Sequence, residues 1–208
     1  MNVEAVTIDA YGTLVSLRDP VPSLRTALAR RGVDLDESTV RAAFAAEVAF
    51  YVERSHEGRD EATLALLRRD CAAVFLEAAG ARLDPDEFAP AFLASLAFEE
   101  VRGAADACRA LRADGLRLAV VSNWDVGLHE HLRALGLSTL VDAVVTSAEA
   151  GAPKPAPAVF ELAMARLGAA PARTVHVGDA AADAEGARAA GLRFEPAPLT
   201  RAAARILA

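Results

Sequence analysis

The order of the apolar segments is the feature that most constrains the fold of this chain. A short β-prone segment, residues 3–8, precedes a block from Pro20 to Phe98 in which only helices are expected. After residue 103, short apolar strands alternate with helices. Such alternation predicts a parallel sheet covered by helices on both faces. The fold class predicted is therefore α/β: a doubly wound parallel sheet with an inserted helical domain.

The first strand is separated in sequence from all the others, so the core must be discontinuous. We expect residues 1–15 and 99–208 to form the α/β domain and residues 16–98 to form the helical insertion. Asp36 and Asp60 are placed to cap two of its helices, because a carboxylate accepts hydrogen bonds from the first free amides of a helix.

In the first of these two capped helices, one apolar stripe is expected to face the inside of the helical domain. Its members follow helical spacing: Val40, Phe44, Val48 and Tyr51.

Charge and composition exclude several classes of function. The formal net charge of −7 argues against binding to nucleic acid or to an anionic membrane, since both require a basic face. The N-terminus lacks the basic and apolar regions of a signal peptide, and no apolar run is long enough to span a membrane. Cys71 and Cys108 lack metal-site spacing, which indicates buried thiols in a reducing compartment. We expect a cytoplasmic protein, monomer or homodimer, with a small-molecule substrate.

Polar residues follow the expected strands at the points where the strands end. They are Asp9, Ser122-Asn123, Thr146-Ser147 and Gly178-Asp179, and the loop after the third strand carries Lys154. Ligands of open parallel sheets bind beyond the carboxyl ends of the strands. These side chains are therefore predicted to converge on one site.

The residue types at this edge indicate nucleophilic catalysis beside a metal. A carboxylate such as Asp9 can form an ester that water later hydrolyses. Ser122 and Lys154 are expected to hold or neutralise the transferring oxygens, with Lys154 also holding the nucleophile. Asp179 and Asp183 stand four residues apart on a strand-to-helix turn, where both can face Asp9. Three crowded carboxylates repel one another, and a bound Mg²⁺ relieves that repulsion.

Four short motifs occur in the order found in the haloacid dehalogenase superfamily, which the chain resembles over nearly its whole length. They are Asp9-Ala10-Tyr11-Gly12-Thr13-Leu14, Val121-Ser122-Asn123, Lys154-Pro155, and Gly178-Asp179 followed by Asp183. The resemblance implies a Rossmann-like core with an α-helical cap and a hydrolase with Asp9 as nucleophile. It also implies that Tyr11, Gly12, Thr13 and Asn123 surround the substrate. Several segments are most similar to a subgroup named haloacid-dehalogenase-like hydrolase domain-containing proteins.

Tyr11 leaves two reactions open. Phosphatases of the superfamily carry an aspartate at this position as general acid and base, whereas the motif with tyrosine resembles that of the metal-independent 2-haloacid dehalogenases. Against dehalogenation, Gly178-Asp179 is intact and Phe160 stands where those enzymes carry a tyrosine. We therefore expect a Mg²⁺-dependent phosphohydrolase acting on a small phosphorylated metabolite. The metal ligands expected are Asp9, Asp179, Asp183 and the backbone oxygen of Tyr11.

Two alternatives remain open at this point: a 2-haloacid dehalogenase, and a catalytically weak or idle binding protein of the same fold. A further residue, His176, lies in an apolar strand beside the site. It is interpreted as a core histidine with satisfied hydrogen bonds rather than as a catalyst.

Overall fold

The computed structural model describes residues 3–208, which divide into two compact units. Residues up to Ser16 together with Glu99–Ala208 form the α/β unit, and Leu17–Phe98 form the helical unit. Within the described residues, no helix is both long enough and apolar enough to cross a membrane.

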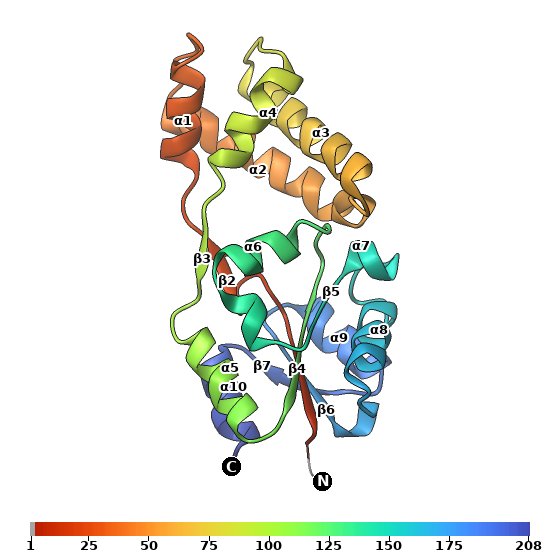
Figure 1. Cartoon of the computed structure of the whole chain (residues 1–208). Coiled ribbons are helices and arrows are strands. Elements are labelled where there is room, and N and C mark those ends of the chain that lie inside the picture. Colours follow the sequence, from red (N-terminus) through yellow and green to blue (C-terminus); the bar gives the residue numbers. More distant parts are fainter. Residues whose placement is uncertain (1–2) are drawn as a thin grey trace. The chain divides into compact units, whose positions relative to one another are not determined.

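The α/β unit is built on five parallel strands in the order β5-β4-β1-β6-β7 (Figure 1). The strands are β1 (Ala5–Ile8), β4 (Arg117–Ser122), β5 (Ala143–Thr146), β6 (Thr174–Gly178) and β7 (Arg193–Pro196). All of β1 and β6 is buried, as expected for strands with helices on both sides. The strand order reverses at β1, which pairs with β4 on one side and β6 on the other. The carboxyl end of β1 is therefore the switch point of the sheet.

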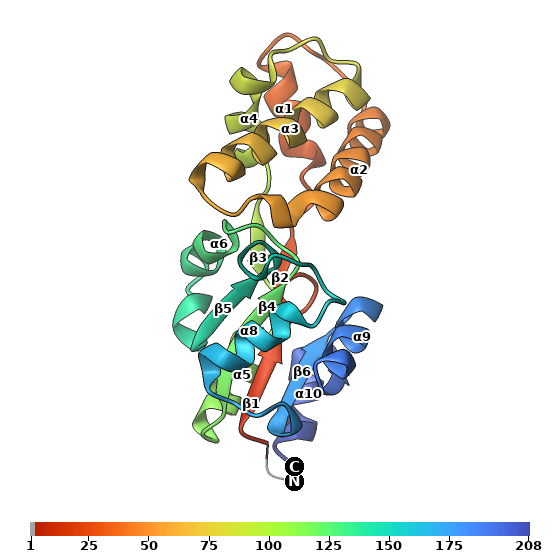
Figure 2. The ribbon, with the colours of Figure 1, turned by 90° about the vertical axis from the view of Figure 1, so that its right-hand side faces the viewer.

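Helices cover both faces of this sheet. Helices α5 (Ala104–Ala113) and α10 (Leu199–Ile206) lie together on one face, and α8 (Ala158–Leu167) and α9 (Ala181–Ala189) lie on the other (Figure 2). Shorter helical segments complete the unit: α6 (Leu128–Ala134), η2 (Leu137–Leu140), α7 (Ser147–Ala150) and η3 (Pro171–Arg173). The predicted doubly wound α/β fold is confirmed.

Two short strands, which the sequence pattern did not indicate, carry the chain out of the α/β unit and back. They are β2 (Val15–Leu17) and β3 (Phe98–Glu100), and they pair with each other as a separate two-stranded sheet. Three residues per strand are too few to show an alternating apolar pattern.

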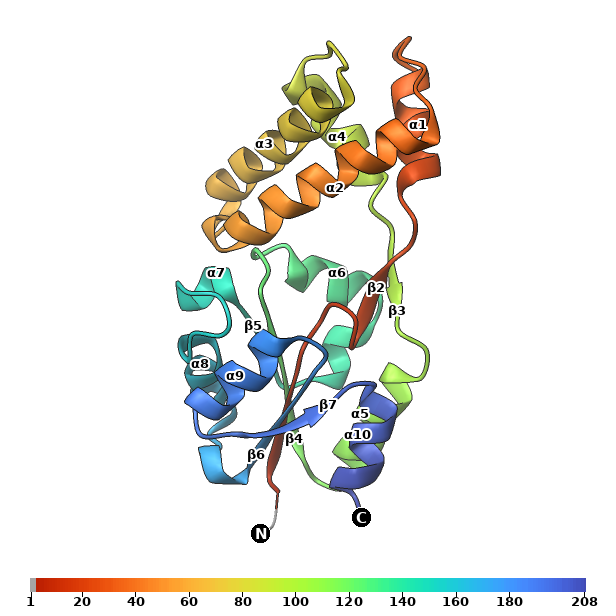
Figure 3. The same cartoon turned by 180° about the vertical axis from the view of Figure 1, so that it is seen from behind.

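The helical unit contains four helices, with α2 and α3 running side by side as a hairpin (Figure 3). They are α1 (Val21–Ala29), α2 (Glu37–Arg54), α3 (Glu61–Ala79) and α4 (Pro85–Ala94), with the turn η1 (Ser55–Glu57) between α2 and α3. The predicted caps are confirmed, because the Asp36 carboxylate accepts from Thr39 N and the Asp60 carboxylate from Thr63 N. Three buried phenylalanines, Phe75, Phe88 and Phe92, have ring centroids 5.3–6.5 Å apart at the centre of this unit.

The predicted inward stripe of α2 is wrong at one position. Val48 is 39% exposed, whereas the neighbouring Glu47 is only 5% exposed. The helix buries Val40, Ala43 and Glu47, which follow the spacing i, i+3, i+7 on one face. Burial raises the pKa of Glu47 to about 7, although a hydrogen bond with Cys71 partly opposes the shift.

Glu47→Gln is expected to stabilise the protein at alkaline pH. The raised pKa means that the fold favours the protonated acid, so stability is fully present below pH 4.5 and is lost as the pH rises through about 7. At about pH 9 the variant should exceed the wild type by up to about 3 kcal/mol, and at about pH 4 the difference should nearly vanish. Denaturant unfolding followed by far-ultraviolet circular dichroism measures both values.

Glu53→Gln is the matched control, because Glu53 lies on the same helix and is exposed. Its effect on the free energy of unfolding should be small, because an exposed side chain loses few contacts. A Glu47→Gln variant with the pH dependence of the wild type would contradict the burial of an ionisable carboxyl at this position.

Candidate active site

The side chains predicted to converge come together at the carboxyl edge of the sheet. Asp9 follows β1, Ser122 ends β4, Asp179 follows β6, and Lys154 lies in the loop between α7 and α8. Thr146 ends β5 and Ser147 begins α7, and both side chains make local structural contacts. Thr146 caps α7, and the Ser147 hydroxyl bonds to the backbone of Trp124.

Lys154 is buried at the centre of this group, with 7% of its surface exposed. Its Nζ atom lies 2.5 Å from Asp9 Oδ1, 2.6 Å from Asp183 Oδ1 and 3.1 Å from the carbonyl oxygen of Val121. An ammonium group has three N–H donors, so these three acceptors use all of them. The ammonium group is therefore fixed in position rather than solvated.

Asn123 holds the backbone of Lys154 from both sides. Its Oδ1 accepts from Lys154 N at 2.6 Å, and its Nδ2 donates to Lys154 O at 3.1 Å. The sequence predicted Asn123 as a residue beside the substrate. Its observed contacts join the end of β4 to the lysine loop, and its place beside the substrate stays a prediction.

Three carboxylates surround the fixed ammonium group. Asp9, Asp179 and Asp183 each offer one oxygen, and these oxygens all lie within 4.8 Å of one another. Asp9 and Asp183 are buried, and Asp179 is exposed. Gly12 leaves room for this cluster, because a Cβ atom there would lie 2.2 Å from Asp179 Oδ2 and the residue has φ +81°. Oxygen-rich sites with carboxylates are suited to Mg²⁺, so the donor set fits that cation.

Burial and charge shift the pKa values of the cluster in different directions. Burial, and then the charge of Asp183, raise the pKa of Asp9 to about 6, although Lys154 opposes them. Burial and Asp183 also raise the pKa of Asp179. For Asp183, burial is outweighed by the hydrogen bond from His176 and the charge of Lys154, so its pKa is lowered. At neutral pH, Asp9 and Asp183 are therefore carboxylates.

The three predicted site residues that carry a hydroxyl group have different surroundings. Ser122 Oγ donates to Asp9 Oδ1 at 3.4 Å, so Ser122 and Lys154 contact the same oxygen of the nucleophile candidate. The Thr13 hydroxyl is fully buried and has no hydrogen-bond partner among residues 3–208. Tyr11 is 53% exposed, and its ring centroid lies 6.5 Å from that of Trp124.

The sequence did not indicate the groups that orient Asp183. Its Oδ2 accepts from Ala180 N at 3.0 Å, and its Oδ1 lies 3.1 Å from His176 Nε2. Gly178 is required here, because a Cβ atom would lie 2.4 Å from the carboxyl carbon of Asp183. The position of Gly178 directly before Asp179 was the only sequence signal for this packing.

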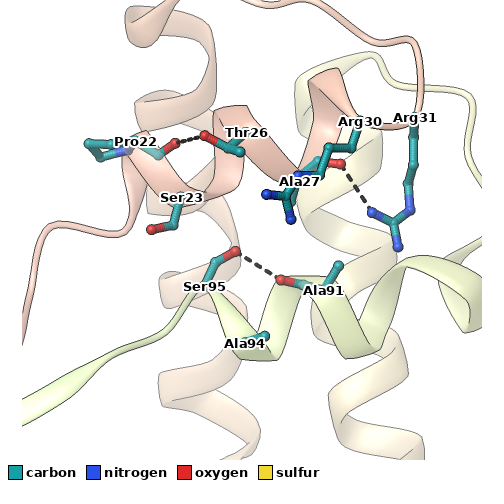
Figure 4. A pocket seen from close by; sticks show the side chains of 9 residues that line it. All are labelled: Pro22, Ser23, Thr26, Ala27, Arg30, Arg31, Ala91, Ala94 and Ser95. Atoms are coloured by element: carbon teal, nitrogen blue, oxygen red, sulfur yellow. Dashed lines mark hydrogen bonds between the residues drawn. The ribbon is translucent and has the colours of Figure 1, made fainter.

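The helical unit carries a separate groove of about 420 Å³ between α1 and α4 (Figure 4). Two of its three hydroxyl groups donate to backbone carbonyls one turn earlier, Thr26 to Pro22 O and Ser95 to Ala91 O. Arg31 donates to Ala27 O at the end of α1. Among the described residues that line this groove there is no carboxylate.

Comparison with known proteins gives consistent matches. A family model of the haloacid dehalogenase-like hydrolases matches residues 3–191. "Haloacid dehalogenase-like hydrolase domain-containing protein 3" of Mus musculus is 32% identical over 92% of this chain and 80% of its own length. Ribulose-1,5-bisphosphate 5-phosphatase of Halopiger xanaduensis is 40% identical over 41% of this chain and 38% of its own length. Among solved structures, an L-2-haloacid dehalogenase matches with a TM-score of 0.75 at 19% identity, covering 100% of both chains.

Lys154→Met is expected to destabilise the α/β unit strongly. Removal of one partner leaves the buried Asp9 and Asp183 carboxylates without the ammonium group, and such changes cost about 3–5 kcal/mol. Unfolding in urea at neutral pH, followed by fluorescence of Trp124, the single tryptophan, reports on this unit. Added Mg²⁺ should recover part of the loss, because the cation supplies positive charge to the same carboxylates.

The matched control is Arg109→Met, which removes an ion pair with Asp106 that is equally short, at 2.6 Å, but exposed. It should change stability little, because water screens exposed pairs. If both variants are equally stable, the Lys154 contacts are not the buried ion pairs described above.

Proposed function

Because the chain belongs to the haloacid dehalogenase-like hydrolases, we propose that it is a Mg²⁺-dependent phosphohydrolase acting on a small phosphorylated metabolite. The observation that supports this proposal most directly is the buried carboxylate of Asp9. One of its oxygens accepts a hydrogen bond from Lys154, and Asp9 belongs to a cluster of three carboxylates. The similarity to the ribulose-1,5-bisphosphate 5-phosphatase of Halopiger xanaduensis supports a phosphate ester as substrate.

The cation would be held by Asp9, Asp179, Asp183 and the backbone oxygen of Tyr11. When bound, it neutralises negative charge on the phosphoryl oxygens of the substrate. Gly12 supports this assignment, because its lack of a side chain keeps space open beside Asp179 Oδ2. Lys154 contributes the other positive charge at the site.

Asp9 is the group we assign as nucleophile. Lys154 and Ser122 both donate to its Oδ1, which orients the carboxylate and directs Oδ2 to the phosphorus atom. The bond from Oδ2 to phosphorus forms as the bond from phosphorus to the leaving oxygen breaks, and that oxygen takes a proton from water. Water then attacks the acyl phosphate, releases inorganic phosphate and restores the carboxylate.

Tyr11 stands where related phosphatases carry their acid, so protonation of the leaving oxygen lacks a carboxylic acid there. General acid catalysis contributes about 10²–10⁴-fold, against total enhancements of about 10⁶-fold or more. The reaction is therefore slowed rather than abolished. Substrates whose leaving oxygen needs no proton, such as acyl and aryl phosphates, are favoured.

We assign catalysis to residues 1–15 and 99–208 and substrate selection to the helical insertion, residues 16–98. The contacts that support the first assignment all lie within the α/β unit. The second assignment follows from the resemblance to family members in which the insertion is a cap.

Asp9→Asn is expected to abolish hydrolysis of acetyl phosphate and p-nitrophenyl phosphate in the presence of Mg²⁺, a fall of about 10⁴-fold or more. The amide oxygen is a far weaker nucleophile than the carboxylate. Release of inorganic phosphate measures the rate, and rapid acid quench of the wild type should trap phosphate on Asp9.

Asp114→Asn, an exposed carboxylate of the same unit, is the control and should keep full activity. Wild-type hydrolysis that continues unchanged in excess chelator would refute the role of the cation. Halide release from a 2-haloacid without metal would favour dehalogenation instead.

Tyr11→Asp is expected to extend hydrolysis to alkyl phosphates. The new carboxylic acid supplies a proton to poor leaving groups, so kcat/KM for an alkyl phosphate should rise by up to about 10²-fold. The value for p-nitrophenyl phosphate should change much less. A series of phosphate esters with leaving groups of different pKa measures the effect.

Tyr11→Asn is the matched control, because it has the same shape as aspartate but carries no acidic proton. It should leave the preference for activated esters intact. Equal profiles for the Asp and Asn variants would show that the lack of an acid at position 11 does not limit the reaction.

A further inference from the structure

His176 is a fully buried histidine that the proposed reaction does not use. It lies on β6 directly beside Thr7 of β1, its partner in the strand register. Its Nδ1 is 3.0 Å from Thr7 Oγ1, and its Nε2 is 3.1 Å from Asp183 Oδ1. Both ring nitrogens therefore have partners, one in the sheet and one at the site.

These two contacts define which nitrogen carries the proton. Asp183 is a carboxylate and can only accept, so Nε2 must carry the hydrogen that it donates. Because the ring is fully buried, the uncharged form with a single N–H is favoured. Nδ1 then has a lone pair and accepts the hydrogen bond of the Thr7 hydroxyl. Thr7 thus selects the tautomer that points an N–H at Asp183.

The ring has little freedom to leave this position. Phe160 packs edge-on against it, with ring centroids 4.8 Å apart and an interplanar angle of 84°. Phe160 is itself confined by Gly186, where a Cβ atom would lie 2.5 Å from the phenyl ring. The imidazole is therefore a rigid donor.

Asp183 connects the fixed imidazole ring to Lys154 by hydrogen bonds. Its Oδ1 accepts from both His176 Nε2 and Lys154 Nζ, while its Oδ2 accepts from Ala180 N. Lys154 Nζ in turn donates to Asp9 Oδ1. A continuous series of hydrogen bonds thus runs from Thr7 through His176, Asp183 and Lys154 to the nucleophile.

We propose that His176, with its tautomer set by Thr7, is a positioning residue that orients Asp183 and thereby aims Lys154 at Asp9. The inference rests on the proposed function, since Asp9 and Lys154 are its endpoint. His176 touches neither substrate nor cation in this assignment. Groups that orient the residues of a site in this way contribute about 10–100-fold in activity.

Paired amide substitutions separate a positioning role from simple packing. Glutamine can place its amide nitrogen near the position of Nε2, whereas asparagine is one methylene shorter and reaches only the position of Nδ1. His176→Asn should lower kcat for acetyl phosphate about 10–100-fold with KM nearly unchanged. His176→Gln should restore most of the loss. Equal kcat values for the two folded variants would overturn the proposal.

The tautomer is measured without any reaction, which separates this inference from the proposed function. ¹⁵N NMR of the unliganded wild type, with the His176 signal assigned by its loss in His176→Gln, should place the proton on Nε2. Thr7→Val should populate both tautomers and lower kcat, and it also serves if the His176 variants fail to fold. A proton on Nδ1 in the wild type, or full kcat in a folded Thr7→Val variant, would refute the proposal.

If the wild type shows the expected tautomer but hydrolyses no phosphate ester, the proposed function fails while the orientation of Asp183 stands. Thermal unfolding of each variant measures how much folded protein is present, so that kcat is expressed per folded molecule. A loss of kcat that merely parallels the loss of folded protein would assign His176 to the core alone.

Discussion

The site depends on one buried ammonium group. Asp9 and Asp183 come from distant parts of the sequence, and burying either carboxylate without a partner costs several kcal/mol. Lys154 contacts both at 2.5 and 2.6 Å, and Asn123 fixes the backbone that presents it. The ends of three strands and the lysine loop must therefore come together for the charges to be balanced. The arrangement that supports the fold of this edge is the same one that orients the proposed nucleophile.

Residues whose position follows from chain topology could be predicted. Parallel strands end at the same edge, so Asp9, Ser122 and Asp179 were expected to meet there, and the sheet brings them together. The starts of two helices could also be predicted, because the Asp36 and Asp60 carboxylates accept hydrogen bonds from amides three residues further along the chain. A sequence therefore predicts both the contacts between residues close together in the chain and the edge at which parallel strands end.

Features that depend on packing between elements could not be predicted. Glu47 is buried in place of Val48 because the contact face of α2 is set by α3, and a rotation of one residue interchanges them. The role of His176 depends on the register of β6 against β1, which places Thr7 beside it. The sequence interpretation of a satisfied core histidine was correct about burial, but the partner that satisfies Nε2 is Asp183.

Charge separates the two reactions that Tyr11 leaves open. Three carboxylates and one ammonium group give the cluster a formal charge of −2. A 2-haloacid brings another carboxylate toward this charge without a cation, and like charges 4 Å apart repel by about 4 kcal/mol at an effective dielectric constant of 20. A phosphate ester is more negative still, but under the proposed function its oxygens and these carboxylates would bind the same divalent cation, which would turn the repulsion into attraction. The acidity that hinders dehalogenation is thus what phosphoryl transfer requires. Asp179, the exposed member of the cluster, therefore bears more on the choice of reaction than the tyrosine beside the nucleophile.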